Sequence, residues 1–123
     1  MQVESARLPK EFVRDCLLLL LREQPAHGYE LLQRLRPLGF VRDDPGGLYR
    51  TLRALEQDGH VRSSWQRSSA GPDRRTYELT GSGKEELHRR ARALDATRST
   101  LDVFLSRYEE FVALREREPA PRR

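Results

Sequence analysis

The sequence predicts a mainly helical fold with one small β-hairpin and a long helix at its C-terminal end. Three segments in the first half carry apolar residues at helical spacing, and two short alternating segments around a Gly-Pro turn follow them. A continuous helical pattern then runs through residues 81–117. The chain has 123 residues and no internal repeat, which is enough for one domain with a modest core.

The first predicted helix covers residues 9–23 and follows an arm, residues 1–8, that we expect to be loose. Pro9 suits a first helical turn, and apolar residues recur after it at three- and four-residue spacing. Leu18 and Leu19 widen this apolar stripe, so we expect the helix to be buried on more than one side.

Two further helices are predicted before the hairpin. The second runs from residue 27 to residue 35 or 38, where a proline and a glycine close it. The third begins with Asp44 as its N-cap and Pro45 at its first position, and Gly59 fits a left-handed residue after its end. Its buried face is one row of leucines: Leu48, Leu52 and Leu55. The arginines and the tyrosine of this helix lie off that row and should point outward.

Residues 61–67 and 74–79 are predicted to be two strands, and residues 70–73 supply the turn chemistry between them. Tyr77 and Leu79 alternate with polar residues, so one face of the hairpin should be buried. A capped helix followed by a basic hairpin is the layout of a winged helix-turn-helix, which indicates that the chain reads DNA.

The last helix is expected to begin after Thr80 as its N-cap. Its apolar stripe alternates steps of four and three residues, which is typical of a coiled-coil seam, with one charged interruption at Arg98. A helix over residues 81–117 spans about 55 Å, longer than a domain of this size, so much of it must pack on another chain. We expect a homodimer with contacts from Leu87, Leu94, Leu101, Phe104, Leu105, Tyr108, Phe111 and Val112. Two-fold symmetry then predicts a pseudo-palindromic DNA site.

The net charge of the chain is weak evidence for a nucleic-acid partner. It is +4 at pH 7, and the excess comes almost entirely from arginine because Lys10 and Lys84 are the only lysines. Arginine binds phosphate and guanine edges well. Codon usage in a high-GC genome nevertheless explains most of the arginine excess. The prediction of function therefore depends on the sequence motifs and not on the net charge.

The sequence lacks the parts of an enzyme, a metal site or a membrane protein. Three histidines show no metal-ligand spacing, and the segment 81–84 resembles a phosphate loop without its upstream glycine, so we expect no catalysis, no metal and no cofactor. Cys16 is the only cysteine and should be an inert core thiol. Its apolar run, residues 16–21, is far shorter than the ~20 residues needed to cross a bilayer. With no signal-peptide pattern, we expect a bacterial cytoplasmic protein that joins the nucleoid when bound to DNA.

Four segments in the right order carry a family resemblance: His27-Gly28-Tyr29-Glu30-Leu31, Leu48 through Glu56, Gly59, and Gly71-Pro72 with Arg74 through Thr80. On these residues the chain resembles PadR-like transcriptional regulators, in register from about Phe12 to Leu87. The resemblance implies a winged-helix dimer that binds operator DNA and usually represses transcription, with the last helix, helped by the first, as the dimer interface. Gly47 departs from the Thr or Ser common in the family, and Gly81 from Pro or Glu.

This organisation divides the chain into a DNA-binding domain at residues 9–80, a dimerisation helix at 81–117 and a disordered tail at 118–123. The residues expected to contact DNA are His27, Tyr29, Gly47, Tyr49, Arg50, Arg53, Arg67, Arg74 and Arg75. Arg50 is the best candidate for a base contact, because Arg pairs bidentately with guanine. The resemblance favours Tyr29 as a phosphate contact at a helix N-terminus.

Each of these assignments has a structural alternative. Arg50 would otherwise be a solvated surface charge, and Tyr49 a partly buried packing residue. His27 is more often a cap than a DNA contact. Arg75 shares the parity of the buried Tyr77 and Leu79, so Arg74 is the stronger wing contact, while an arginine of the hairpin could pair with Asp73 or Glu78 instead. Glu56 is expected to be structural, in an ion pair with an arginine.

Two questions stay open at the level of sequence. Trp65, Phe104 and Tyr108 could line a pocket for a small aromatic or apolar effector, although plain interface packing explains the same residues. The alternative to a DNA-binding regulator is a winged helix that binds only proteins. The basic character of the predicted recognition face argues against that alternative.

Overall fold

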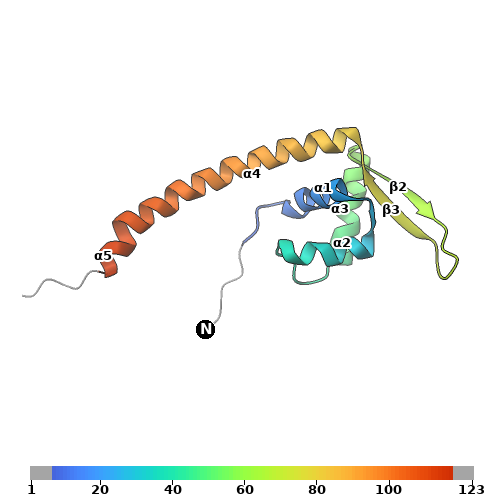
Figure 1. The fold of residues 1–123 in the computed structure, drawn as a ribbon, viewed down its shortest axis with the longest axis horizontal. Coiled ribbons are helices and arrows are strands. Elements are labelled where there is room, and N and C mark those ends of the chain that lie inside the picture. The colour runs from blue at the N-terminus through green and yellow to red at the C-terminus, as the bar shows by residue number, and fades with distance from the viewer. Residues whose placement is uncertain (1–6, 118–123) are drawn as a thin grey trace, which may run out of the picture. The chain divides into compact units, whose positions relative to one another are not determined.

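The computed structural model describes residues 7–117, so most of the expected N-terminal arm and the whole expected tail at 118–123 lie outside the described residues. The chain divides into two compact units, Met1–Arg89 and Arg90–Arg123, and the boundary falls within helix α4. The elements in order are α1 (Phe12–Glu23), β1 (Ala26–His27), α2 (Gly28–Leu35), η1 (Arg36–Leu38), α3 (Pro45–Gln57), β2 (Val61–Gln66), β3 (Arg74–Leu79), α4 (Gly81–Tyr108), η2 (Glu109–Ala113) and α5 (Leu114–Arg117) (Figure 1). The predicted fold class is confirmed.

Helix α1 begins three residues later than predicted. Glu11 takes a left-handed conformation with φ of 64°, and the amide of Phe12 donates to the carbonyl of Pro9 over 3.0 Å, so a separate turn precedes the helix. A proline at a possible first position does not reveal such a turn. The expectation of burial around the helix is half right, because Leu18 is fully buried whereas Leu19 is 43% exposed.

The connection from α2 to α3 contains a glycine stop and a capped start. After η1, Gly39 has φ of 104°, and the amide of Phe40 reaches back to the carbonyl of Leu35, which satisfies the end of the helix. Asp44 caps α3, since its Oδ1 accepts a 3.0 Å hydrogen bond from the amide of Gly47. The predicted N-cap and first-position proline are therefore confirmed.

The end of α3 is joined to the start of α4. Gly59 has φ of 80°, and His60 donates its amide to the carbonyl of Leu55 over 2.9 Å, which completes a Schellman motif. The amide of Thr80 donates to His60 O over 3.0 Å, and the Thr80 hydroxyl donates to Gly59 O over 2.6 Å. The same hydroxyl accepts from the amide of Gly83, as expected of an N-cap.

The hairpin belongs to a three-stranded antiparallel sheet with the order β1-β3-β2, and not to a two-stranded sheet as predicted. Ala26 pairs with Tyr77 and His27 with Thr76, so the two-residue strand β1 ties the start of α2 to β3. β2 ends at Gln66, one residue before the predicted end. A strand of two residues carries no alternation, which explains why the sequence pattern missed it.

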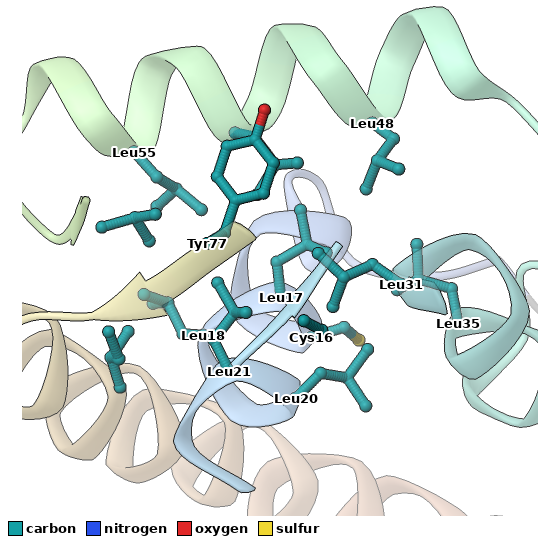
Figure 2. Packing of buried hydrophobic residues seen from close by; sticks show 14 residues of the cluster. Cys16, Leu17, Leu18, Leu20, Leu21, Leu31, Leu35, Leu48, Leu55 and Tyr77 are labelled. Carbon is teal, nitrogen blue, oxygen red and sulfur yellow. The ribbon is translucent and has the colours of Figure 1, made fainter. Parts of the chain in front are cut away.

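The hydrophobic core of the first unit lies between α1, α2, α3 and the inner face of the sheet. Figure 2 shows Tyr77 reaching from β3 toward α3, between Leu48 and Leu55, above the leucines of α1. The three leucines of the predicted α3 row are all buried, as are Tyr77 and Leu79. This packing fixes the roll of α3, and therefore which of its side chains face outward.

The described part of the second unit, residues 90–117, is helical. The rest of α4 passes through the π-helical turn η2 into α5, so the predicted continuous helix holds except for that one turn. Most of its apolar side chains are exposed on the isolated chain, including Leu101, Phe104, Leu105, Tyr108, Phe111 and Val112. A row of exposed large apolar residues on one helix is typical of a surface that another chain covers.

Candidate nucleic-acid interface

The outer face of α3 presents Tyr49, Arg50 and Arg53, all exposed as predicted from the leucine row. Within residues 7–117 the guanidinium of Arg50 makes no ion pair or hydrogen bond. A β-carbon on Gly46 would lie 3.5 Å from Arg50 Nη1, so the Arg50 side chain lies back along the first turn of the helix. An unpaired, exposed guanidinium at the N-terminal end of this helix is free to approach a base edge.

Gly47 has a local structural explanation. A β-carbon at this position would overlap Asp44 Oδ2 and lie 2.8 Å from Asp44 Cγ, because the carboxylate folds over the first turn to cap the helix. The Thr or Ser that the family resemblance leads one to expect would displace this cap. Only the backbone of Gly47 is therefore offered to a ligand, and its amide is already used by Asp44.

Tyr49 packs against the start of α2. A β-carbon on Gly28 would overlap the Tyr49 hydroxyl and lie 2.7 Å from the ring carbons Cε1 and Cζ. Tyr49 is therefore a packing residue that can also contact DNA, since its ring packs on the backbone of α2 while its side chain stays partly exposed. Tyr29, which follows Gly28 in α2, is 68% exposed. Glycine at position 28 is what allows α3 and the start of α2 to come this close.

His27 serves as the N-cap residue of α2. Its amide donates to Glu30 Oε1 over 3.1 Å, and its ring Nε2 lies 3.1 Å from the same oxygen. Glu30 also accepts from Arg34 one turn further along the helix. These contacts are those of a helix cap, which is the structural alternative to a DNA contact for His27.

We call the hairpin of β2, β3 and the turn between them the wing. Three of its arginines, Arg67, Arg74 and Arg75, differ in their side-chain contacts. Arg75 is tied to Glu56 and Ser63, whereas within the described part of the chain Arg74 and Arg67 make no side-chain hydrogen bond or ion pair. The expected ion pair of Glu56 therefore exists, with Arg75 as the partner.

The alternative that the sequence left open, a pairing of Arg67, Arg74 or Arg75 with Asp73 or Glu78, is not found among the described residues. Glu78 accepts a 2.6 Å hydrogen bond from Arg62 across the hairpin, because these two residues are direct partners in the ladder between β2 and β3. Within residues 7–117, Arg74 and Arg67 are the wing arginines that have no side-chain partner.

A hollow on the surface of the first unit connects these parts. It lies between the start of α2, the outer side of α3 and the wing, and its lining residues are His27, Gly28, Tyr29, Tyr49, Trp65, Asp73, Arg74, Arg75 and Tyr77. Five of the nine predicted DNA contacts line it, namely His27, Tyr29, Tyr49, Arg74 and Arg75. Trp65 lies here too, 68% exposed, whereas Phe104 and Tyr108 belong to the second unit.

The predicted dimer contacts fall into two groups. Leu87 is partly buried and packs against the core of the first unit, so part of its surface is already covered within its own chain. Leu94 is half-buried, and the remaining six residues of the set are exposed on the second unit.

The buried thiol of Cys16 is 3% exposed, and burial, together with the neighbouring Asp15 carboxylate, raises its pKa to about 11. A thiol with so high a pKa is unreactive near neutral pH, as expected of a core cysteine. Residues 7–117 contain no cluster of three or more potential metal ligands. The helices in this range are also too short or too polar to cross a membrane.

Comparison with known proteins gives one family. The sequence profile of the "Transcriptional regulator PadR-like family" matches residues 17–89. The transcriptional regulator Rv3488 of Mycobacterium tuberculosis is 39% identical over 90 residues, which cover 70% of this chain and 82% of that protein. The probable transcriptional regulator Rv1176c of the same organism is 38% identical over 75 residues, but these cover 59% of this chain and only 40% of that protein.

Among solved structures, Bacillus subtilis PadR in complex with operator DNA is similar to this chain. The two share 26% sequence identity with a TM-score of 0.58, over 66% of this chain and 46% of the other.

Proposed function

The chain belongs to the PadR-like family of transcriptional regulators, and we propose that it is a homodimeric repressor that reads a pseudo-palindromic operator. The family is one of regulators, which confirms the expectation that the chain is not an enzyme. The observation that supports DNA binding is the juxtaposition, in one compact unit, of an unpaired Arg50 on α3 with a hollow lined by tyrosines and arginines. The structural neighbour bound to operator DNA supports the same function.

The position of each side chain decides whether we assign it to a base or to the DNA backbone. Arg50 and, one turn further along, Arg53 project from α3 and would enter the major groove, with Arg50 placed to read guanine. Tyr29, Tyr49 and Arg74 line the hollow beside α3, and their hydroxyl and guanidinium groups suit a backbone phosphate. Arg67 lies next to the hairpin turn, where it would meet the flanking backbone or the minor groove.

The exposed apolar side chains of the second unit supply the dimer contact. Leu101, Leu105 and Val112 continue the seam of four- and three-residue steps, and Phe104 and Phe111 widen it. Covering these side chains with the same helix of a second copy would place two recognition helices in a two-fold symmetric arrangement.

An effector site fits the second unit better than the first. Phe104 and Tyr108 are exposed aromatics among the dimer contacts, so a small aromatic or apolar molecule bound there would act on the interface. Trp65 lies in the hollow beside Arg74 and Tyr29, and we therefore assign it to the DNA-facing surface. As a regulator of chromosomal genes, the protein would work in the cytoplasm.

The experiment that tests this function is genome-wide mapping of the DNA bound by the protein in its own cells, followed by binding assays on the enriched sites. A repressor predicts a few sharply bound promoter sites, including the DNA upstream of its own gene. A winged helix that binds only proteins would enrich no duplex, and its basic face would then need another explanation.

A further inference from the structure

Three side chains connect the end of the recognition helix to the wing. Glu56 lies in the last turn of α3, Ser63 on β2 and Arg75 on β3. The Ser63 hydroxyl donates to Glu56 Oε2 over 2.6 Å, and Arg75 Nε donates to Ser63 Oγ over 2.8 Å. Arg75 Nη2 lies 3.4 Å from Glu56 Oε1 and closes the triangle. We call Glu56, Ser63 and Arg75 the brace.

Two aromatic rings hold the guanidinium of Arg75 in place. Its Cζ lies 5.8 Å from the centroid of the Trp65 ring and 6.0 Å from that of Tyr77. Trp65 is the direct ladder partner of Arg75, and Ser63 is the partner of Tyr77, so the register of the hairpin brings all four side chains to one face. The guanidinium thus has its Nε and Nη2 donors occupied and its faces next to rings.

We propose that Arg75 and Glu56 are positioning residues that fix the wing against α3, and that Arg75 does not itself contact DNA. This inference rests on the proposed function. β1 pairs only with Thr76 and Tyr77, so the hairpin from Arg75 outward has two strands, which are only marginally stable alone. The angle of this outer part to α3 therefore depends on such contacts. The free cation Arg74 is the neighbour of Arg75 on the same strand, and the brace therefore sets where Arg74 stands relative to Arg50.

The negative charge of Glu56 allows two effects on DNA affinity to be told apart, because they predict changes in opposite directions. Removing a carboxylate beside a polyanion should strengthen binding if only Coulomb forces count. If the brace positions the wing, the Glu56→Gln variant should instead weaken binding to the operator, because the arginine loses its charged partner. The amide is nearly the same size as the carboxylate, and the site is partly exposed, so folding should be little affected.

The first arm of the test needs no DNA. Trp65 is the only tryptophan, so its fluorescence reports on the brace directly. The Glu56→Gln variant should show lower Trp65 anisotropy and faster quenching by acrylamide than the wild type. The matched control is Glu23→Gln, which removes one exposed carboxylate at the end of α1, outside the brace. Unchanged Trp65 anisotropy in Glu56→Gln would overturn the proposal, whatever the protein binds.

The second arm uses a duplex that the wild-type protein enriches from a random library, and a random-sequence duplex beside it. We expect Glu56→Gln and Arg75→Gln each to weaken binding to the enriched duplex about tenfold, and the double variant to be no worse than either single variant. Binding to the random duplex should change much less. Additive losses, or Glu56→Gln binding as tightly as Glu23→Gln, would overturn the proposal. A wild type that enriches nothing would refute the proposed function instead, while the Trp65 arm still decides the brace.

Discussion

The ring of Tyr49 lies directly against the backbone of Gly28, so closely that a β-carbon on the glycine would overlap the tyrosine hydroxyl. This contact joins the outer face of α3 to the first residue of α2. It explains in physical terms why a glycine precedes Tyr29, and it sets the spacing between two side chains that we place on the DNA backbone.

The Gly28→Ala substitution should therefore displace Tyr49. We expect the free energy of unfolding to fall by about 1–2 kcal/mol from overpacking, and operator affinity to fall with it. Urea unfolding and a gel-shift assay measure the two effects. In a Tyr49→Ala background, Gly28→Ala should cost little further stability, because the ring that it would overlap is absent. Two strictly additive losses would show that the contact is not the cause.

The joint between α3 and α4 gives a matched pair of glycine substitutions. A β-carbon on Gly83 would overlap the carbonyl oxygen of His60 and lie 2.7 Å from Leu79 Cδ1, whereas a β-carbon on Gly81 meets nothing within 4 Å. Gly83→Ala should destabilise the protein by about 1–3 kcal/mol. Gly81→Ala should stabilise it by up to about 1 kcal/mol, because alanine favours a helix. Thermal or urea unfolding of the two variants checks the opposite signs, and equal effects would contradict the geometry of the joint.

The proposed dimer contact can be tested by placing negative charges at its centre. Leu101→Asp combined with Leu105→Asp places two carboxylates on the exposed apolar row of the second unit. These residues are not part of the core of the first unit, so that unit should still fold. Sedimentation should show monomers for the double variant and dimers for the wild type. A dimer that survives both substitutions would exclude this row as the interface.

Arg74 is expected to contact phosphate, because it is exposed and unpaired within residues 7–117. Arg74→Ala should weaken binding to all duplexes by a similar factor and reduce the slope of log K against log salt by about 1. Titrations at several salt concentrations measure this slope. A loss of sequence preference with an unchanged slope would instead make Arg74 a base-reading residue.

The sequence predicts most of the first unit because its local signals agree. Asp44, Pro45 and Gly59 mark the ends of α3, and the leucine row fixes which side chains face outward. The start of α1 was wrong by three residues because Pro9 is compatible with both a helix and the turn that the structure contains. The strand β1 was missed because two residues are too few to show alternation.

The sequence predicts only those features of the site that depend on a single helix or strand. Helical spacing alone indicates that Tyr49 and Arg50 are exposed. The pairing of Arg75 with Glu56, and the presence of Trp65 in the hollow, depend on how the wing folds back on α3. Such contacts join residues far apart in the sequence, and neither periodicity nor motif spacing contains them.

Whether Arg50 reads an operator base can be measured by selecting duplexes from a random library with the purified wild-type protein and with Arg50→Ala. We expect the wild type to enrich a two-fold symmetric motif with a guanine in each half-site. The Arg50→Ala variant should lose preference at that base pair, at a cost of about 1–3 kcal/mol in binding free energy. An unchanged motif for Arg50→Ala would show that another residue reads the base. If the wild type enriches no sequence, the protein is not a sequence-specific DNA-binding regulator.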